Sequence, residues 1–114
     1  MQGKERKIAA NYIYWPGFPL VKNGYLIWQE GKETRVIASE GGIREIQGLE
    51  FYGGLLVPDY VMEHAGDFRE GEDMIAVLKK LYLHSEKECK GIAIIERADL
   101  KQLIWCPEAI IRKC

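Results

Sequence analysis

Glycine and proline interrupt the first half of this chain at short intervals, and this spacing limits the fold more than any other feature of the sequence. The interruptions are Pro16-Gly17, Asn23-Gly24, Gly31, Gly41-Gly42, Gly53-Gly54 and Pro58. Between them lie short runs of apolar and aromatic residues. Short strands separated by frequent glycine turns are typical of a sandwich or a barrel. The sequence therefore predicts a mainly β fold, which we expect to be a small β-sandwich.

The expected strands follow from these runs. They cover residues 7–15, 19–29, 34–38, 43–46 and 49–57 in the first part of the chain, and 92–96, 100–105 and 110–112 in the last part. Asn23-Gly24 is a strong hairpin signal because both residues tolerate a positive φ angle. A turn or bulge at this dipeptide is expected to divide residues 19–29 into two short strands. Gly53-Gly54 is expected to break the strand that Pro58 ends.

One segment has a different period. Residues 72–88 contain neither glycine nor proline, and Met74, Val77, Leu78 and Leu81 recur at helical spacing, with Ile75 and Tyr82 widening the stripe. This pattern predicts a helix over about 73–85. Packing against the core is the favoured role of the stripe. Its alternative role is a protein interface, and the candidate interface residues are Met74, Val77, Leu78, Leu81 and Tyr82.

Length and charge exclude several classes of protein. A chain of 114 residues is one domain and is too short for a (β/α)8 barrel, which needs roughly 200 residues. Its net charge of -1 does not fit a nucleic-acid-binding protein, which usually carries a basic excess. No run approaches the roughly 18 apolar residues of a membrane span. Three cysteines and an N-terminus without an apolar leader predict a cytoplasmic protein with reduced thiols.

The residues that could carry chemistry form no recognisable motif. The soft and imidazole metal ligands are His64, His84, Cys89, Cys106 and Cys114, without the closely spaced pairs of a structural zinc site. The chain has neither a nucleophile elbow nor a phosphate-binding loop. A buried, inert thiol is the favoured interpretation of Cys106. The sequence thus predicts no catalytic residue, no metal site and no cofactor.

Two segments of the chain resemble the amidohydrolase superfamily, in its aminohydrolase or cytosine-deaminase-like branch. Residues 8–27 and 35–61 resemble the N-terminal segment of these enzymes through AANYIY at 9–14, LVKNGY at 20–25 and GLEFYGGLLVP at 48–58. Residues 90–101, KGIAIIERADLK, resemble the segment that returns from the barrel, and residues 102–112 resemble the closing strands. In such enzymes these parts build a composite β-sandwich beside a metal-binding barrel.

The departure from the family pattern falls where the metal ligands would be. The family continues from its sandwich into the first barrel strand with Pro-Gly-Phe-Val-Asn-x-His-x-His, and both histidines bind the metal. Here His64 falls on the first ligand position and Gly66 replaces the second. The later barrel strands that supply the other ligands have no counterpart. The resemblance implies a sandwich half at 1–61, a linker with the helix at 62–89, and a second half at 90–114.

Two hypotheses about function follow. The first is a non-catalytic, barrel-less relative of the amidohydrolases that acts as a homo-oligomer or by binding a protein partner. Without the barrel, an apolar face of the sandwich needs a cover, which could be the helix, a second copy or another protein. The alternative is a metal-dependent hydrolase of carbon–nitrogen bonds, completed by oligomerisation or by a partner barrel protein. Its candidate ligands are His64, His84 and Glu63.

Overall fold

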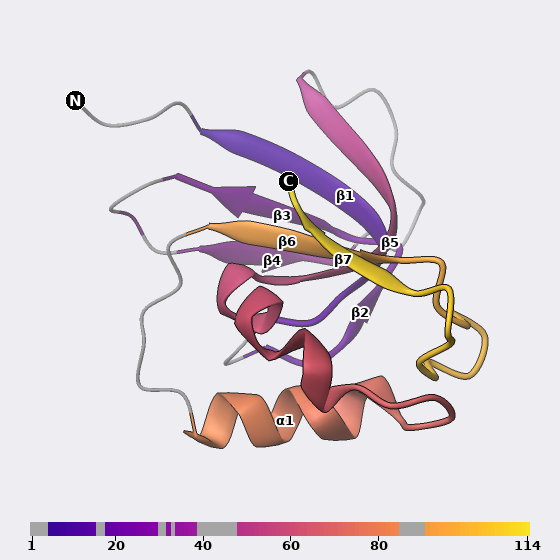
Figure 1. The fold of residues 1–114 in the computed structure, drawn as a ribbon. Coiled ribbons are helices and arrows are strands. Elements are labelled where there is room, and N and C mark those ends of the chain that lie inside the picture. The colour runs from indigo at the N-terminus through magenta and orange to yellow at the C-terminus, as the bar shows by residue number, and fades with distance from the viewer. Residues whose placement is uncertain (1–4, 16–17, 30–31, 33, 39–47, 85–90) are drawn as a thin grey trace.

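The computed structural model describes residues 5–15, 18–29, 32, 34–38, 48–84 and 91–114. Its elements are shown in Figure 1. In chain order they are β1 (Arg6–Ile13), β2 (Val21–Lys22), β3 (Tyr25–Trp28), β4 (Arg35–Ile37), β5 (Leu49–Pro58), the 3-10 helix η1 (Asp59–Asp67), α1 (Met74–His84), β6 (Ile92–Glu96) and β7 (Ile110–Lys113). The expected strand at 43–46 lies outside the described residues.

The described strands join in one mixed sheet. The strand order is β4-β3-β1-β5-β6-β7, and β2 also pairs with β1. Only the β1–β5 pair is parallel. The prediction of a mainly β domain with one α-helix between two β-rich parts is confirmed. Because β6 pairs with β5, the first and last parts of the chain share a single sheet.

Two clusters of buried side chains lie on opposite sides of this sheet. We call the first the helix-side core, because α1 and η1 cover it (Figure 1). It contains Tyr14, Leu55, Val57, Tyr60, Val61, Phe68, Met74, Val77, Leu78, Ala93 and Ile95. The second is the strand-side core, which the strands and their own side chains enclose. It contains Ile8, Ala10, Ile13, Trp15, Val21, Leu26, Leu56, Ile92 and Ile94.

The apolar run at 92–96 separates these cores. Successive side chains of a strand point to opposite faces of a sheet. In β6, Ile92 and Ile94 enter the strand-side core, whereas Ala93 and Ile95 enter the helix-side core. All four are at most 2% exposed. A strand that is buried on both faces requires a continuous apolar sequence rather than an alternating one, which is why this run has no polar residue before Glu96.

Gly54 forms a bulge in β5 rather than the predicted break. The register between β1 and β5 shifts between Ala10 and Tyr12, so one extra β5 residue is accommodated there. The Gly54 amide donates to Asn11 Oδ1 at 2.9 Å. Gly54 has a φ of 145°, and a Cβ at this position would lie 2.2 Å from the Ile95 carbonyl oxygen. Glycine is therefore needed for both the backbone conformation and the close approach of β6.

The Asn23-Gly24 dipeptide divides two short strands, as predicted, but it does not reverse the chain. Both β2 and β3 run antiparallel to β1, with Val21 opposite Ile13 and Tyr25 opposite Ala9. Asn23 adopts a φ of 56° and its amide donates to the Asn11 carbonyl. The dipeptide thus interrupts a single line of strand, and the expected division of residues 19–29 into two short strands is confirmed.

Helix α1 begins and ends close to the predicted limits. Asp73 caps its first turn, since Oδ1 accepts from the amides of Ile75 at 2.9 Å and Ala76 at 3.4 Å. The end of the prediction, residue 85, lies outside the described residues.

The expected strand at 100–105 is wrong. This segment is a compact turn that docks on the residues before α1. The Met74 amide donates to the Leu103 carbonyl, and the Trp105 amide donates to the Glu72 carbonyl. The rings of Phe68 and Trp105 stack with centroids 4.9 Å apart. The apolar side chains of this turn therefore anchor the helix instead of extending the sheet.

Candidate functional site

The segment that the resemblance aligns with the first barrel strand is a 3-10 helix. The chain leaves β5 at Pro58 and winds through η1 over the helix-side core. Tyr60 and Val61 bury their side chains in that core. The Asp59 amide donates to the Gly91 carbonyl, which fixes the start of η1 beside β6. Residues after Pro58 are therefore used to cover the domain's own core.

His64 lies on the outer surface of η1. Its side chain is 42% exposed, and Nδ1 lies 3.2 Å from Asp67 Oδ2. The Asp67 side chain is 58% exposed. Gly66 is exposed, and a Cβ placed on it would meet nothing within 4 Å. The position of the second family histidine is thus open surface, and one imidazole with one carboxylate is half of the four ligands that zinc commonly takes.

The other candidate ligands do not converge on His64 within the described part of the chain. Glu63 is exposed on η1. The Sγ atom of Cys106 lies 3.8 Å from the Ile104 carbonyl oxygen. Cys89 lies outside the described residues, and so does the side chain of His84. Among the residues that the structure describes, no three His, Cys, Asp or Glu side chains are placed to hold a metal ion.

The predicted interface stripe is largely buried within the chain. Met74, Val77 and Leu78 are at most 6% exposed and pack in the helix-side core, and Leu81 packs against its margin. These side chains face the sheet because helical spacing places them on one side of α1. Of the five candidate residues, Tyr82 alone is largely available to a partner, at 46% exposed. The interface interpretation is therefore wrong for Met74, Val77 and Leu78.

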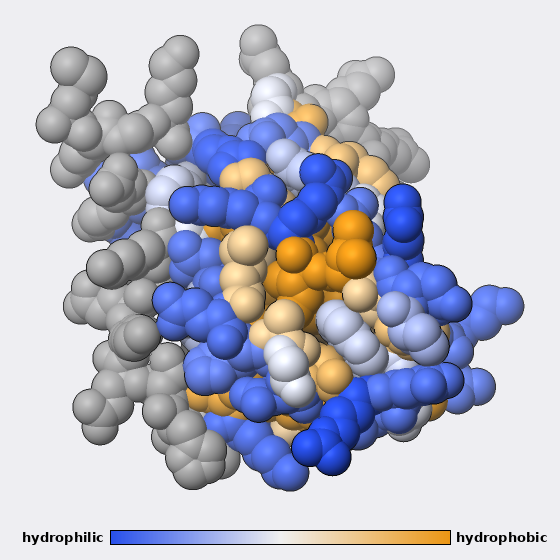
Figure 2. All heavy atoms as spheres, viewed as in Figure 1, coloured by the Kyte–Doolittle hydropathy of each residue, from blue (hydrophilic) through white to orange (hydrophobic). Residues whose placement is uncertain are grey.

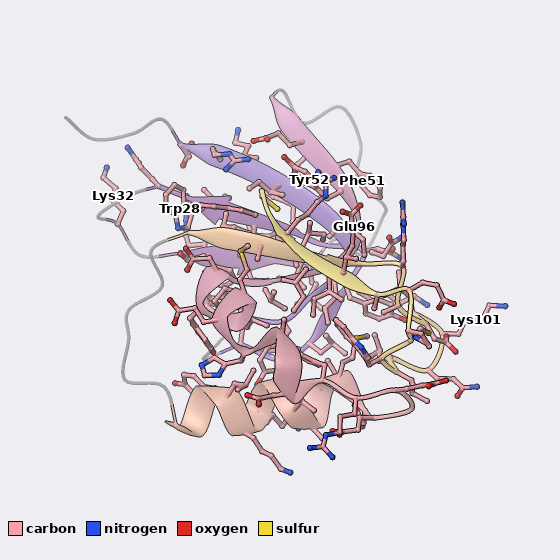
Figure 3. All side chains as sticks on the ribbon, in the orientation of Figure 1. Trp28, Lys32, Phe51, Tyr52, Glu96 and Lys101 are labelled. Atoms are coloured by element: carbon pink, nitrogen blue, oxygen red, sulfur yellow. The ribbon has the colours of Figure 1, made fainter. Side chains whose placement is uncertain are left out.

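A border of paired polar side chains lies beside the strand-side core, where Tyr52 and Cys114 pack, and sequence reasoning missed it. Arg6 makes a bidentate ion pair with Glu50, with Nη2 to Oε1 at 2.8 Å and Nε to Oε2 at 2.9 Å. Tyr52 donates from its hydroxyl to Glu50 Oε1. Arg112 pairs with Glu96 across β6 and β7. Tyr52 on β5 and Glu96 at the end of β6 are labelled in Figure 3.

The electrostatics of this border are those of paired charges. The hydrogen bonds from Arg6 lower the pKa of Glu50, and the same bonds raise the pKa of Arg6. Burial raises the pKa of Cys114 to about 11, although Arg6 and Arg112 oppose this shift. A thiol with such a pKa is neutral at physiological pH and is a poor nucleophile. The border therefore links β1 to β5 and β6 to β7, and it offers no activated group.

The spacing of residues in the sequence gave only a weak indication of this border. Arg6 precedes Ile8 by two positions, and Glu50 precedes Tyr52 by two. Strand alternation therefore places each pair on one face. The parallel register that sets Ile8 opposite Glu50 cannot be read from either segment alone.

Two hollows lie on the described surface. One, of about 350 Å³, is lined by Asp67, Arg69, Glu72, Val77, Lys80 and Leu81. The other, of about 460 Å³, is lined by Glu5, Ile27, Gln29, Lys32 and Arg35. Active sites usually combine a cleft with desolvated titratable groups. Among the described residues no charged side chain is buried, so neither hollow has that character.

Comparisons with protein-family models, with curated proteins and with solved structures find no match to this chain. Within the described residues, the structure contains no helix with the length and apolar character needed to cross a membrane.

Proposed function

We propose that this chain is a non-catalytic, barrel-less relative of the amidohydrolases that acts by associating with protein, either a second copy of itself or a different partner. The observation that carries this proposal is the conformation of η1. The residues that the resemblance aligns with the first metal-binding barrel strand form a 3-10 helix that packs on the domain's own sheet. A barrel strand cannot occupy the same residues while Tyr60 and Val61 remain in the core.

The arrangement of potential ligands supports the same proposal. Hydrolysis by a metal-activated water needs several protein ligands around an open coordination position. His64 has Asp67 beside it, and no third His, Cys, Asp or Glu side chain among the described residues joins these two to hold a metal ion. A second copy or a partner protein would have to supply the remaining ligands for the alternative function, a hydrolase of carbon–nitrogen bonds.

The experiment that tests this proposal measures bound metal and turnover together. Protein purified without chelators is analysed by elemental mass spectrometry, and the same sample is assayed for release of ammonia from amides and aminated nucleobases. We expect less than a stoichiometric amount of zinc or iron and no turnover above the blank. About one metal per chain together with turnover would overturn the proposal and favour the alternative function.

A matched pair of variants makes the test specific. His64→Ala removes the potential ligand, and Arg69→Ala changes a nearby exposed residue that cannot ligate a metal. We expect both variants to match the parent chain in metal content and in free energy of unfolding, because each side chain is exposed. Loss of metal in His64→Ala alone would support the hydrolase instead.

A further inference from the structure

We infer that β7 is a docking edge for a second copy of this chain, which pairs with it antiparallel and joins the two sheets. This inference rests on the proposed function and specifies how self-association would occur. It starts from the position of β7, which is the last strand in the order of the sheet and pairs only with β6 among the described strands.

The hydrogen-bonding direction of β7 follows from one measured contact. The Cys114 amide donates to the Ile92 carbonyl at 3.0 Å, in register with the β6–β7 pair. Along an antiparallel pair, residues alternate between bonding the neighbouring strand and pointing away from it. The backbone groups of Ile110 and Arg112 therefore face β6. Those of Ile111 and Lys113 face outward, where no described residue bonds them.

Apolar side chains accompany this open edge. Ile110 is 43% exposed on β7, and Met62 is 36% exposed on the neighbouring η1. Figure 2 shows an apolar area near the middle of this face, over β7, bordered by hydrophilic residues. An open edge with apolar neighbours is a site where another strand can add to the sheet. Proline and bulges, two of the features that protect such edges, do not occur within β7, whereas its charged residues, Arg112 and Lys113, restrict the registers in which a second strand can pair.

Charge disfavours two registers of the pair. If the two-fold axis passes beside Arg112, the arginines of the two copies face each other on the same side of the sheet, which is unfavourable. If the axis passes beside Lys113, the lysines of the two copies face each other in the same unfavourable way. If it passes beside Ile111, Arg112 lies opposite Ile110 of the second copy, and Lys113 lies opposite Ala109. The third register avoids like charges and is the one that we propose.

This register also satisfies the outward backbone groups. The two Ile111 residues exchange a pair of N–H···O=C bonds, and each Lys113 amide donates to the Ala109 carbonyl of the other copy. The contact is self-complementary, as a two-fold dimer requires. It is smaller than a standard interface, which takes about 800 Å² from each partner. We therefore expect a weak dimer, with a dissociation constant between about 10 µM and 1 mM.

The test is molar mass by light scattering over a range of protein concentrations. The parent chain should rise from its 13.1 kDa monomer mass toward twice that value as concentration increases. Lys113→Pro removes an outward amide and should remain monomeric, since proline is tolerated where an edge N–H faces solvent. Lys113→Ala is the matched control, because it removes the charge and keeps the amide. It should dimerise at least as well as the parent chain.

Amide exchange measured by NMR on the parent chain tests the same contact without a variant. Exchange at Ile111 and Lys113 should slow about threefold or more between low and high concentration, because only the monomer fraction exposes these amides. The Arg112 amide, which bonds β6, should be protected at every concentration.

Three results would overturn the inference. They are a parent chain that stays monomeric at about 1 mM, a folded Lys113→Pro variant that dimerises like the parent, and exchange at Ile111 and Lys113 that does not depend on concentration. A dimer that persists in Lys113→Pro would place self-association on another surface and leave the proposed function intact. Bound metal with turnover would instead overturn the proposed function, and the edge would still be judged by the exchange data.

Discussion

The two sides of the sheet are closed in different ways. The helix-side core is closed by segments that are added to the sheet, namely η1, α1 and the turn that holds α1 in place. The strand-side core is closed by the sheet itself, with Trp15, Trp28 and Tyr52 among its enclosing side chains and an ion-paired border beside it. Burial of the helix-side core therefore depends on the docking of a helix, whereas burial of the strand-side core depends on the register of the strands.

This difference is the basis of the function proposed above. The residues after β5 form part of the cover of the helix-side core, and Val61 is fully buried there. A chain that uses these residues as a cover can close its core without a barrel. The same residues are then not available to form a metal-binding strand.

The largest expected effect comes from the β5 bulge, where Gly54 lies against β6. Gly54→Ala would place a Cβ 2.2 Å from the Ile95 carbonyl at a φ of 145°, so β5 and β6 would have to separate. We expect a loss of about 4 kcal/mol or more, or failure to fold, in urea denaturation. Gly53→Ala is the control, since its nearest atom would be Asn11 Oδ1 at 3.9 Å, and it should lose less than about 1 kcal/mol. Equal losses in both variants would contradict the role of the bulge.

Truncations on the two sides test whether the cores unfold together. Leu56→Ala removes a fully buried side chain from the strand-side core, and Met74→Ala removes one from the helix-side core. Each should lose about 2–5 kcal/mol in a single denaturant transition. Amide hydrogen exchange distinguishes the two sides. In Met74→Ala the α1 amides should lose their protection at low denaturant while the β6 amides stay protected. Early exchange of β6 in that variant would show that the two sides are not separable.

A smaller effect is expected at the start of α1. Asp73→Ala removes the carboxylate that accepts from the amides of Ile75 and Ala76. The loss should be about 1 kcal/mol in thermal or urea unfolding, and it should affect the helix side alone. Asp73→Asn keeps a capping oxygen and should stay within a few tenths of a kcal/mol of the parent chain. If both substitutions cost the same, capping does not explain the effect.

The smallest effect is a pH dependence on the strand side. Because hydrogen bonds from Arg6 lower the pKa of Glu50, the ionised carboxylate stabilises the fold above its ordinary pKa of about 4.3. This contribution is lost as pH falls through the lower folded-state pKa. Glu50→Gln should lose about 0.5 kcal/mol at pH 7, since the pair is partly exposed. The free energies of unfolding of the two proteins should converge as the pH falls below the folded-state pKa of Glu50, and a constant difference would contradict the ion-pair explanation.

The local sequence pattern predicted an element correctly where the period of its apolar residues decides the structure. The helical stripe gave α1 to within a residue at its start, and the apolar run gave β6 with its observed limits. The local pattern failed at residues 100–105, where the apolar run expected to form a strand forms a turn against the start of α1. Period cannot distinguish an apolar strand from an apolar turn, because both bury side chains. The partner that buries them is far away in the sequence.

The sequence by itself determined the mainly β class, the α-helix and the glycines at which strands are interrupted, because these depend on backbone freedom and on the period of apolar residues. Tertiary structure decided the rest. The parallel pairing of β1 with β5 converts a glycine break into a bulge, and it brings Arg6 to Glu50. The cover over the helix-side core turns the residues after Pro58 into η1. Each outcome is set by contacts between distant segments, whose free energy no local pattern contains.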